Sequence, residues 1–336
     1  MTRVLIVAER GAKIHVHRGA VVVATSEGRY TIPAADVDRI VLVTSTISIT
    51  TAAIRRLAKM GIDILVLDAL GNPVTTITPP WFTASSATRL AQYRAAADPA
   101  TRLQVARSII RAKILSQAAL AEAAEQWMGA EPRGTANRLK RLAAEASRAE
   151  SIERLRVIEA AAARRYWRLY SSLLPEDLGF HGRDPDAGDD VNTALNYLYG
   201  LLYSWTTRAL AAHGLDPYIG FIHVDRSGAE TLTYDQAELF RVAAVDTLLL
   251  CMLRSGWRPQ RDPDTRLLTP ETRTHLVREY TRWVREKRVR DAATGRRETI
   301  ERHMMLQARL LARTLRSHNP GSYTPFTMEA EPPCTS

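Results

Sequence analysis

The sequence contains few cysteines, few aromatic residues and no long apolar run, and each shortage excludes a class of protein. Cys251 and Cys334 are the only cysteines, one in an apolar run and one near the end, which leaves no disulfide framework. No stretch approaches the roughly 20 apolar residues that span a bilayer, and the apolar run after Met1 is too short for a signal-peptide core. We therefore expect a cytoplasmic protein with no membrane segment.

Lysine is also scarce, although the chain is basic. The formal net charge is +10, and lysine supplies only five of the 46 basic residues, at positions 13, 59, 113, 140 and 287. The other 41 are arginine, whose planar fork of donors grips a phosphate at two points. This balance favours a polyanionic partner, with nucleic acid ahead of a membrane surface. A GC-rich genome and a solvated charged surface would explain the same composition.

The first 80 residues have the short apolar runs that are typical of strands. β-Branched residues dominate these runs, and Gly11, Gly19 and Gly28 separate them. We predict strands over 4–8, 13–17, 20–25, 39–44 and 62–67, with one helix over 51–60 that ends before Gly61. Pro79–Pro80 and the polar stretch around Ser85 predict a linker.

Beyond that linker the apolar period becomes helical. We predict helices over 99–127, 144–173, 190–213 and 235–253, and two more after Pro270 and after Glu298. The chain exceeds the usual size of one domain. The sequence therefore predicts an α+β protein with two domains, a small β-rich N-terminal domain over 1–80 and a larger all-helical domain over 81–316. A disordered tail is predicted over 317–336 from its proline, serine and threonine content.

Glu159 stands on an apolar helical stripe. Helical spacing places it on the face of five other side chains: Ile152, Leu155, Ala162, Ala163 and Tyr166. An unpaired buried carboxylate costs several kcal/mol, so it needs a cation, a hydrogen-bond cage or a proton. A buried salt bridge to an arginine, or a partly solvated rim position, is the alternative interpretation.

Glu238 and His223 are two further polar residues in apolar surroundings. Asp235 and Glu238 have the spacing of a helix capping box, but the apolar helix that follows predicts a central position for Glu238. His223 lies on a short extended segment and, taken alone, is an ordinary core or surface histidine. Two carboxylates with one imidazole form a mixed oxygen and nitrogen set that suits Mg²⁺ or Mn²⁺. The lack of thiolates and of a second imidazole argues against zinc.

A polar stripe on the apolar helix over 190–213 needs hydrogen-bond partners. Asn192, Asn196, Tyr199 and Tyr203 recur along one side of this helix. The stripe faces either a functional site or an internal network, and the sequence does not separate these two interpretations.

Four motif blocks resemble the CRISPR-associated spacer integrases, the adaptation subunits of CRISPR systems. They are Ile158-Glu159-Ala160-Ala161-Ala162 with Arg165-Tyr166-Trp167, then Val191-Asn192-Thr193-Ala194-Leu195-Asn196 with Tyr199, then Gly214-Leu215-Asp216-Pro217 with Gly220-Phe221-Ile222-His223, and finally Thr231-Leu232 and Asp235-Gln236-Ala237-Glu238-Leu239-Phe240-Arg241 with Asp246. The order and spacing agree over nearly the whole chain. Departures occur at Ala160 and Val242, where the family usually has glycine and proline, at the segment before the central helix, where it often has paired prolines, and at Ala229, where a basic residue is common.

The resemblance implies a metal-dependent DNA integrase and endonuclease that acts in CRISPR adaptation and antiviral defence. It implies that Glu159, His223 and Glu238 are the catalytic residues and together bind Mg²⁺ or Mn²⁺, with Tyr166, Asn192 and Asp235 as supporting residues. A 3′-OH of a captured DNA fragment would attack the backbone of the CRISPR repeat by transesterification, and water as nucleophile would give nuclease activity. The implied partners are double-stranded DNA, a second copy of the chain joined partly through the β-rich domain (with the 39–44 strand and its neighbours as a candidate interface), and a small ferredoxin-like adaptation subunit.

Arginines on the helix after Pro270 form a candidate DNA-binding surface. Arg278, Arg282 and Arg285 share one side, and Arg288 extends the basic run. A solvated helical face, partly neutralised by Glu279 and Glu286, is the alternative. For the chain as a whole, the competing interpretations are a non-catalytic DNA-binding scaffold of the same fold and a helical transcription regulator. The regulator is disfavoured because it leaves the β-rich part unexplained and because no short helix-turn-helix pattern stands out.

Overall fold

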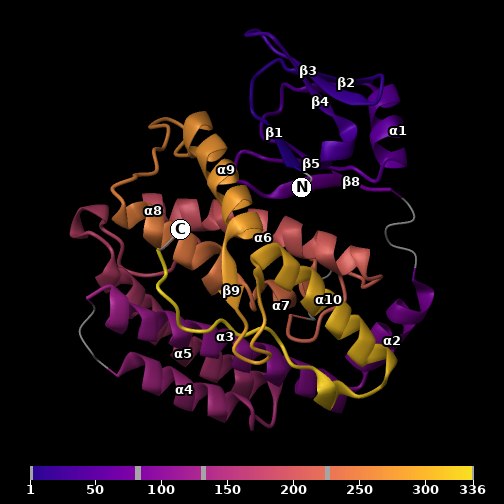
Figure 1. Ribbon diagram of the computed structural model, residues 1–336. Coiled ribbons are helices and arrows are strands. Elements are labelled where there is room, and N and C mark those ends of the chain that lie inside the picture. Colours follow the sequence, from indigo (N-terminus) through magenta and orange to yellow (C-terminus); the bar gives the residue numbers. More distant parts are fainter. Residues whose placement is uncertain (1–2, 80–84, 130–133, 224–227, 335–336) are drawn as a thin grey trace.

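The computed structural model describes residues 3–79, 85–129, 134–223 and 228–334 (Figure 1). A β-rich N-terminal region is followed by a larger helical region, which confirms the α+β class predicted from the sequence. Most of the predicted linker falls on residues 80–84, outside the described residues, so the domain boundary near residue 80 stays a prediction. Among the described residues, no helix has both the length and the apolar character needed to cross a bilayer.

The N-terminal region contains two four-stranded sheets. In the first, β1 (Arg3–Val7), β5 (Val37–Leu42) and β7 (Asp63–Leu67) run parallel, and β8 (Pro73–Ile77) pairs antiparallel with β7. In the second, β4 (Arg29–Pro33), β3 (Ala20–Ala24) and β2 (Lys13–His17) are antiparallel, and the short β6 (Ser48–Ile49) runs parallel to β2. Helix α1 (Thr51–Lys59) is capped by the Thr50 hydroxyl.

The first sheet contributes to two apolar cores, because successive side chains of a strand point to opposite faces. Ile40, Leu42 and Ile64 pack with the second sheet and α1. Val41 and Leu65 instead join the core of the helical region. The sheet is therefore the layer between the two parts of the molecule.

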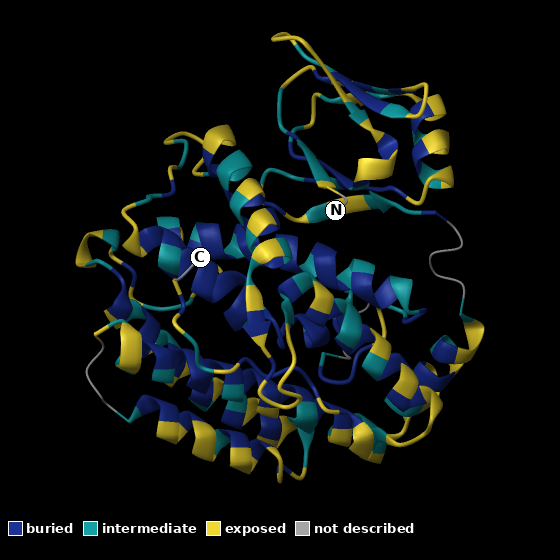
Figure 2. Cartoon of the chain, in the orientation of Figure 1, coloured by how far each residue is buried: buried dark blue, intermediate teal, exposed yellow. Residues whose placement is uncertain are grey.

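Helices of eight or more residues form the body of the helical region in the described part of the chain. They are α2 (Ser86–Ala97), α3 (Pro99–Trp127), α4 (Thr135–Ala146), α5 (Ile152–Leu173), α6 (Asp190–Ala212), α8 (Thr247–Arg254), α9 (Pro270–Glu286) and α10 (Ile300–Arg316). Helix α6 is buried along most of its length and lies directly beneath the first sheet (Figure 2). A Cβ on Gly200 of α6 would stand 2.4 Å from the carbonyl oxygen of Gly71, in the β7–β8 turn, so glycine permits this close approach.

An ion network joins the two parts. Arg39 on β5 donates to Asp63 on β7 at 2.7 Å, and Arg208 on α6 also reaches Asp63, at 3.1 Å. Arg39 is buried and its guanidinium lies over the ring of Trp205 on α6. β5 lies inside the sheet, between β1 and β7, and its side chains face the two cores of the same chain, so the predicted dimer interface stays a prediction for the neighbouring strands.

Two of the predicted helices are interrupted. The helix predicted over 144–173 is divided into α4 and α5, and α5 begins where the Ser151 hydroxyl accepts from Arg154 N. The helix predicted over 235–253 begins earlier, with α7 (Thr231–Ala237), continues as a π-helical stretch (Arg241–Asp246) and only then becomes α8. Glu238 therefore lies at the C-terminal end of α7, so the capping box predicted for Asp235 and Glu238 is wrong.

The C-terminal segment is ordered where disorder was predicted. Residues 317–334 are described, and their buried side chains include Tyr323, Phe326 and Met328. Phe326 stacks on Phe240 with ring centroids 5.1 Å apart, and Tyr323 donates to the Gln236 side chain at 3.0 Å. Tertiary burial thus orders a segment whose composition alone predicts a disordered chain.

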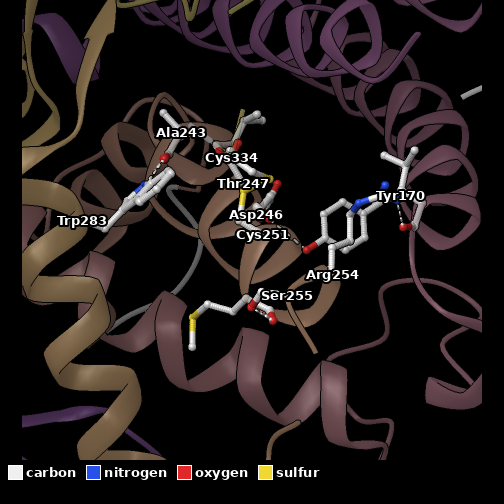
Figure 3. Close-up of a disulfide and its surroundings, with 12 residues drawn as sticks. Tyr170, Ala243, Asp246, Thr247, Cys251, Arg254, Ser255, Trp283 and Cys334 are labelled. Carbon is white, nitrogen blue, oxygen red and sulfur yellow. Dashed lines mark hydrogen bonds between the residues drawn. A yellow bond between two sulfur atoms is a disulfide. The ribbon is translucent and has the colours of Figure 1, made fainter. Parts of the chain in front are cut away.

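The two cysteines form one disulfide, which corrects the expectation from the sequence. Cys334 is joined to Cys251 on α8, next to Thr247 and Asp246 (Figure 3). The two positions are 83 residues apart, so only the fold brings their Cα atoms to 5.3 Å. The bond fastens the end of the ordered C-terminal segment to the helix that follows the candidate site.

Candidate metal centre

Three helices bring two carboxylates and one ammonium group together. Glu159 lies in the middle of α5, Glu238 at the end of α7, and Lys113 on the buried side of α3. Lys113 Nζ lies 2.5 Å from Glu159 Oε1 and 2.8 Å from Glu238 Oε2. The two acidic residues, 79 positions apart in sequence, therefore converge on one cationic atom.

Burial differs among these three side chains. The Glu238 side chain is 4% exposed, Lys113 is 11% exposed and Glu159 is 19% exposed. Burial tends to raise the pKa of Glu238, but Arg241 and Lys113 outweigh it, and the pKa lies below the usual value. Burial tends to lower the pKa of Lys113, but Glu159 and Glu238 outweigh burial, and the pKa lies above the usual value. Glu238 and Lys113 therefore stabilise one another in their charged forms.

Arg241 supplies a second positive charge. Its Nη2 atom lies 3.1 Å from Glu238 Oε1 and donates to the Tyr203 hydroxyl at 2.9 Å. The guanidinium also lies over the ring of Tyr199, 4.7 Å from the centroid. With partners on several sides, Arg241 is fixed in place and fixes one oxygen of Glu238.

His223 is held by Asp235. Its Nδ1 lies 2.7 Å from Asp235 Oδ1, and this hydrogen bond is the main reason why the pKa of His223 is raised. Glu238 and Glu159 also raise the pKa of His223, because their negative charges lie nearby. With Nδ1 engaged as a donor, Nε2 is the ring atom that is left to bind a ligand.

Side chains from three helices fix the segment that carries His223 by hydrogen bonds to its backbone. Asp235 Oδ2 accepts from Phe221 N and Ile222 N at 2.5 and 2.9 Å. The carbonyl oxygens of the same two residues accept from Arg102 on α3 and Arg156 on α5. A Cβ on Gly220 would stand 2.7 Å from Asp235 Oδ2, so glycine is required for Asp235 to approach this closely.

A further buried carboxylate, Asp246, lies near Arg241. It accepts from the Tyr166 hydroxyl at 2.7 Å and from the Tyr199 hydroxyl at 2.6 Å, while Tyr170 donates to its backbone carbonyl. Burial raises the pKa of Asp246 to about 6, and the two hydroxyls moderate the shift. This cage ties α5 and α6 to the π-helical stretch next to Glu238.

The donors fit a divalent cation, although a complete ligand set is not preassembled. Among the described residues, no group of three or more His, Cys, Asp or Glu side chains is arranged to hold a metal ion. Glu238 Oε2, however, is buried, and the Lys113 ammonium at 2.8 Å is its partner among the described residues. Two carboxylates that already share one cation, with an imidazole nearby, form a donor set that a hard cation would satisfy.

The other predicted site residues take different roles. Tyr166 binds Asp246, and Asn192 binds Arg183, Asp189 and the backbone at Gly182 and Asp184. None of these contacts reaches the three candidate ligands in the described part of the chain. The polar stripe on α6 is thus divided, with Tyr199 and Tyr203 facing Arg241 and the two asparagines facing the loop at Arg183.

The predicted DNA-binding arginines also separate. Arg278, Arg282 and Arg288 are exposed, and Arg282 is paired with Glu279 on the same helix. Arg285 is only 19% exposed and lies 3.2 Å from Asp38 on β5 and 3.5 Å from Glu301 on α10. It therefore connects α9 to the β-rich region and does not belong to an open basic surface.

Sequence reasoning missed Lys113 and Arg241. Lys113 stands on the same helical face as Ile109, Ile110 and Leu120, and all three are buried. The test that singles out Glu159, a charged residue on an apolar stripe, would have singled out Lys113 as well. Arg241 follows Glu238 by three residues but lies in the π-helical stretch, where helical spacing is not a guide.

Comparison with known proteins decides the family. The profile of the CRISPR associated protein Cas1 family matches residues 5–282. The chain belongs to the Cas1 family. The CRISPR-associated endonuclease Cas1 of Hyperthermus butylicus is 35% identical over 335 residues, covering 97% of this chain and 98% of that protein. The CRISPR-associated endonuclease Cas1 2 of Saccharolobus solfataricus is 37% identical over 256 residues, covering 76% of this chain and 77% of that protein.

Solved structures give the same fold. A casposase bound to integration product is similar with a TM-score of 0.81 and 26% identity, over 94% of this chain and 91% of that one. A Cas1 protein from Thermotoga maritima has a TM-score of 0.78 over 97% of this chain and all of that one, and at 20% identity it supports the fold alone.

A basic hollow lies along α5, the Cas1 helix that carries Glu159. Its volume is about 440 Å³, and four arginines contribute to its lining: Arg138, Arg164, Arg165 and Arg168. A second hollow of about 460 Å³ continues on the same helix past Trp167 to His181 and Arg183. Both are suited to a polyanion that extends well beyond the three candidate ligands.

Proposed function

We propose that this Cas1-family chain is a divalent-metal-dependent DNA integrase and endonuclease that inserts captured DNA fragments into a CRISPR array. The observation that carries the proposal is the convergence of Glu159 and Glu238, from separate helices, on one cationic position, with the Asp235-held His223 close enough for its pKa to respond to both. The family and the casposase with its integration product support the same chemistry.

In this proposal Glu159, Glu238 and the Nε2 atom of His223 hold Mg²⁺ or Mn²⁺. A bound ion would offset charge on the phosphate oxygens and lower the pKa of the attacking hydroxyl. Asp235 keeps the proton of His223 on Nδ1, and Arg241 fixes Glu238. His223 serves as ligand or as proton carrier.

The reaction is a phosphodiester exchange. The 3′-oxygen of the captured fragment forms a bond to a phosphorus of the repeat and releases its proton, while the bond from that phosphorus to the departing 3′-oxygen breaks and that oxygen takes up a proton. One phosphodiester is formed for each one broken, so no nucleotide cofactor is required. Water in place of the 3′-OH gives hydrolysis, which is the nuclease activity.

The DNA path in this proposal uses the basic hollows along α5 together with the exposed Arg278, Arg282 and Arg288. Arginine-rich surfaces next to a phosphoryl-transfer site hold the backbone through many contacts that depend on salt. Arg285 is not part of this path, because it forms ion pairs with Asp38 and Glu301.

We also propose a homodimer and an adaptation partner subunit. Family membership carries this proposal, and two solved relatives are complexes of a Cas6, reverse transcriptase and Cas1 protein with Cas2. The outer strands β1 and β4, together with the 720 Å³ hollow that they line, are the candidate contact surface, because each is an edge strand of its sheet. Light scattering on the purified chain tests the dimer, and a monomer at micromolar concentration would contradict it.

The deciding experiment is strand transfer of a 3′-OH DNA duplex into a plasmid that carries a CRISPR repeat, with Mn²⁺ and with chelator. We expect product only with the ion, and a loss of at least 100-fold in Glu159→Gln and Glu238→Gln, because each removes one charged ligand. DNA binding, measured by fluorescence anisotropy, should survive both changes. Equal DNA binding without any metal-dependent product would favour the non-catalytic scaffold.

A further inference from the structure

Lys113 occupies the position between the two acidic residues where a cation is expected to bind. Its ammonium nitrogen contacts Glu159 Oε1 and Glu238 Oε2, and these are the contacts that the described structure gives it. The two carboxylate oxygens therefore lie no farther apart than the sum of those two distances. Two buried carboxylates at this separation repel one another unless a positive charge stands between them.

Helix α3 holds the backbone of Lys113 firmly. Ala112 and Ile114 on either side are buried, and the Ser116 hydroxyl, one turn later, accepts from Met328 N in the ordered C-terminal segment. The long unbranched side chain is the part that can move, since lysine is a point charge on a flexible stem.

Arg241 is not equivalent to Lys113. Its guanidinium binds Glu238 on one side and the Tyr203 hydroxyl on another, and it lies over the Tyr199 ring. If an ion entered the cluster, Arg241 would keep these contacts, whereas Lys113 would have to leave the space between the carboxylates.

We propose that Lys113 is a positioning residue that acts as a built-in counter-ion: it keeps Glu159 and Glu238 converged in the metal-free protein and competes with the incoming divalent ion for the same oxygens. The four charges Lys113, Arg241, Glu159 and Glu238 sum to zero, so the ion meets a neutral cluster in place of two free negative charges. Lys113 therefore weakens metal binding while it stabilises the metal-free fold. This inference rests on the proposed metal site.

Lys113→Met tests the proposal, because methionine preserves length and lack of branching but removes the charge. Mn²⁺ binding is measured by calorimetry and by the loss of the free-ion paramagnetic resonance signal, on the full chain without DNA at pH 8. We expect Mn²⁺ to bind Lys113→Met at least about tenfold more tightly than the wild type, because one competing positive charge is gone. In chelator the variant should melt at a lower temperature than the wild type, and Mn²⁺ should raise its melting temperature by more.

Lys113→Arg keeps the charge and should resemble the wild type in both measurements. Lys140→Met is the matched control, because Lys140 pairs with Glu122 on the surface, away from the cluster, and should change neither. Mn²⁺ affinity that is unchanged or weaker in Lys113→Met, while the wild type binds the ion, would overturn the counter-ion role and leave the proposed function standing. If neither protein binds Mn²⁺, the metal site and this inference fail together, and if only Lys113→Met binds it, the competition is supported.

Discussion

Asp235→Asn is the perturbation that most directly tests how the candidate centre is held. The Asp235 carboxylate is fully buried and engages three hydrogen atoms, those of Phe221 N, Ile222 N and His223 Nδ1. Asparagine has nearly the same size, but only one of its two terminal atoms accepts hydrogen bonds. If its oxygen stays with the two backbone groups, its NH₂ group must face His223 Nδ1.

The expected loss of stability follows from the change in acceptor charge. A hydrogen bond to a charged acceptor contributes about 1.5–3 kcal/mol and a neutral one about 0.5–1.5 kcal/mol. Each of the three bonds is therefore weakened by about 1 kcal/mol, which predicts a loss of roughly 3 kcal/mol. Urea unfolding measures this loss in chelator.

The affinity for the metal ion should fall by more than the loss of fold stability alone would cause. An NH₂ group opposite Nδ1 forces that atom to become the acceptor, which moves the ring proton to Nε2 and blocks the lone pair that a metal would use. Loss of such a supporting partner lowers metal affinity by about 10–100-fold. We therefore expect Mn²⁺ to bind Asp235→Asn at least tenfold more weakly, with strand transfer reduced in parallel.

The pKa of His223 gives an independent readout. The hydrogen bond that His223 donates to Asp235 raises this pKa, so His223 stabilises the metal-free fold at low pH, and this contribution is lost as the pH rises through the raised value. In Asp235→Asn, titration followed by NMR should show a lower pKa. Asp216→Asn is the control, because Asp216 accepts from Tyr93 on the outer side of the same region. A variant at Asp235 with wild-type Mn²⁺ affinity and an unchanged His223 pKa would refute this account.

Three further predictions concern stability and DNA. Cys334→Ser should lower the unfolding free energy by about 4 kcal/mol, because the disulfide to Cys251 closes a loop of 83 residues, and thermal melts with and without reductant test this. Burial raises the pKa of Asp246 to about 6, so the folded chain binds this proton more tightly than the unfolded chain does. Between pH 4 and 7 the unfolding free energy of the wild type should therefore fall by about 3 kcal/mol relative to that of Asp246→Asn. Urea unfolding free energies that change in parallel with pH in the two proteins would contradict this prediction. Arg285→Ala should lower the unfolding free energy by about 2 kcal/mol and leave the salt dependence of DNA binding unchanged. Arg282→Ala should keep the stability and reduce the slope of log affinity against log salt by about one unit. The opposite pattern would show that Arg285 belongs to the DNA-binding surface.

The class of fold and many of the elements were predictable from local pattern. Pro99 after Asp98 predicts the start of α3, and the structure places its end at the predicted Trp127. Such signals are local, because capping and the apolar period act over one or two helical turns. The strands β4 and β8 were missed because neither contains a buried residue or a run of apolar residues.

The sequence also identified Glu159 by itself as a residue in need of a partner. A carboxylate on an apolar stripe must meet a positive charge wherever the helix packs, and the structure supplies Lys113. The identity of that partner is a tertiary fact, because Lys113 and Glu159 lie on different helices and no local spacing relates them.

Tertiary structure alone decided the remaining features. It placed Glu238 at the end of a helix and not at the beginning, because α7 starts at Thr231 and gives way to a π-helical stretch that no periodic pattern predicts. It ordered the C-terminal segment by burying Phe326 against Phe240 and by joining Cys334 to Cys251. Apolar period and capping determine which segments are helices and strands, whereas burial, ion pairing and the disulfide depend on residues that are distant in sequence and become neighbours only when those segments pack.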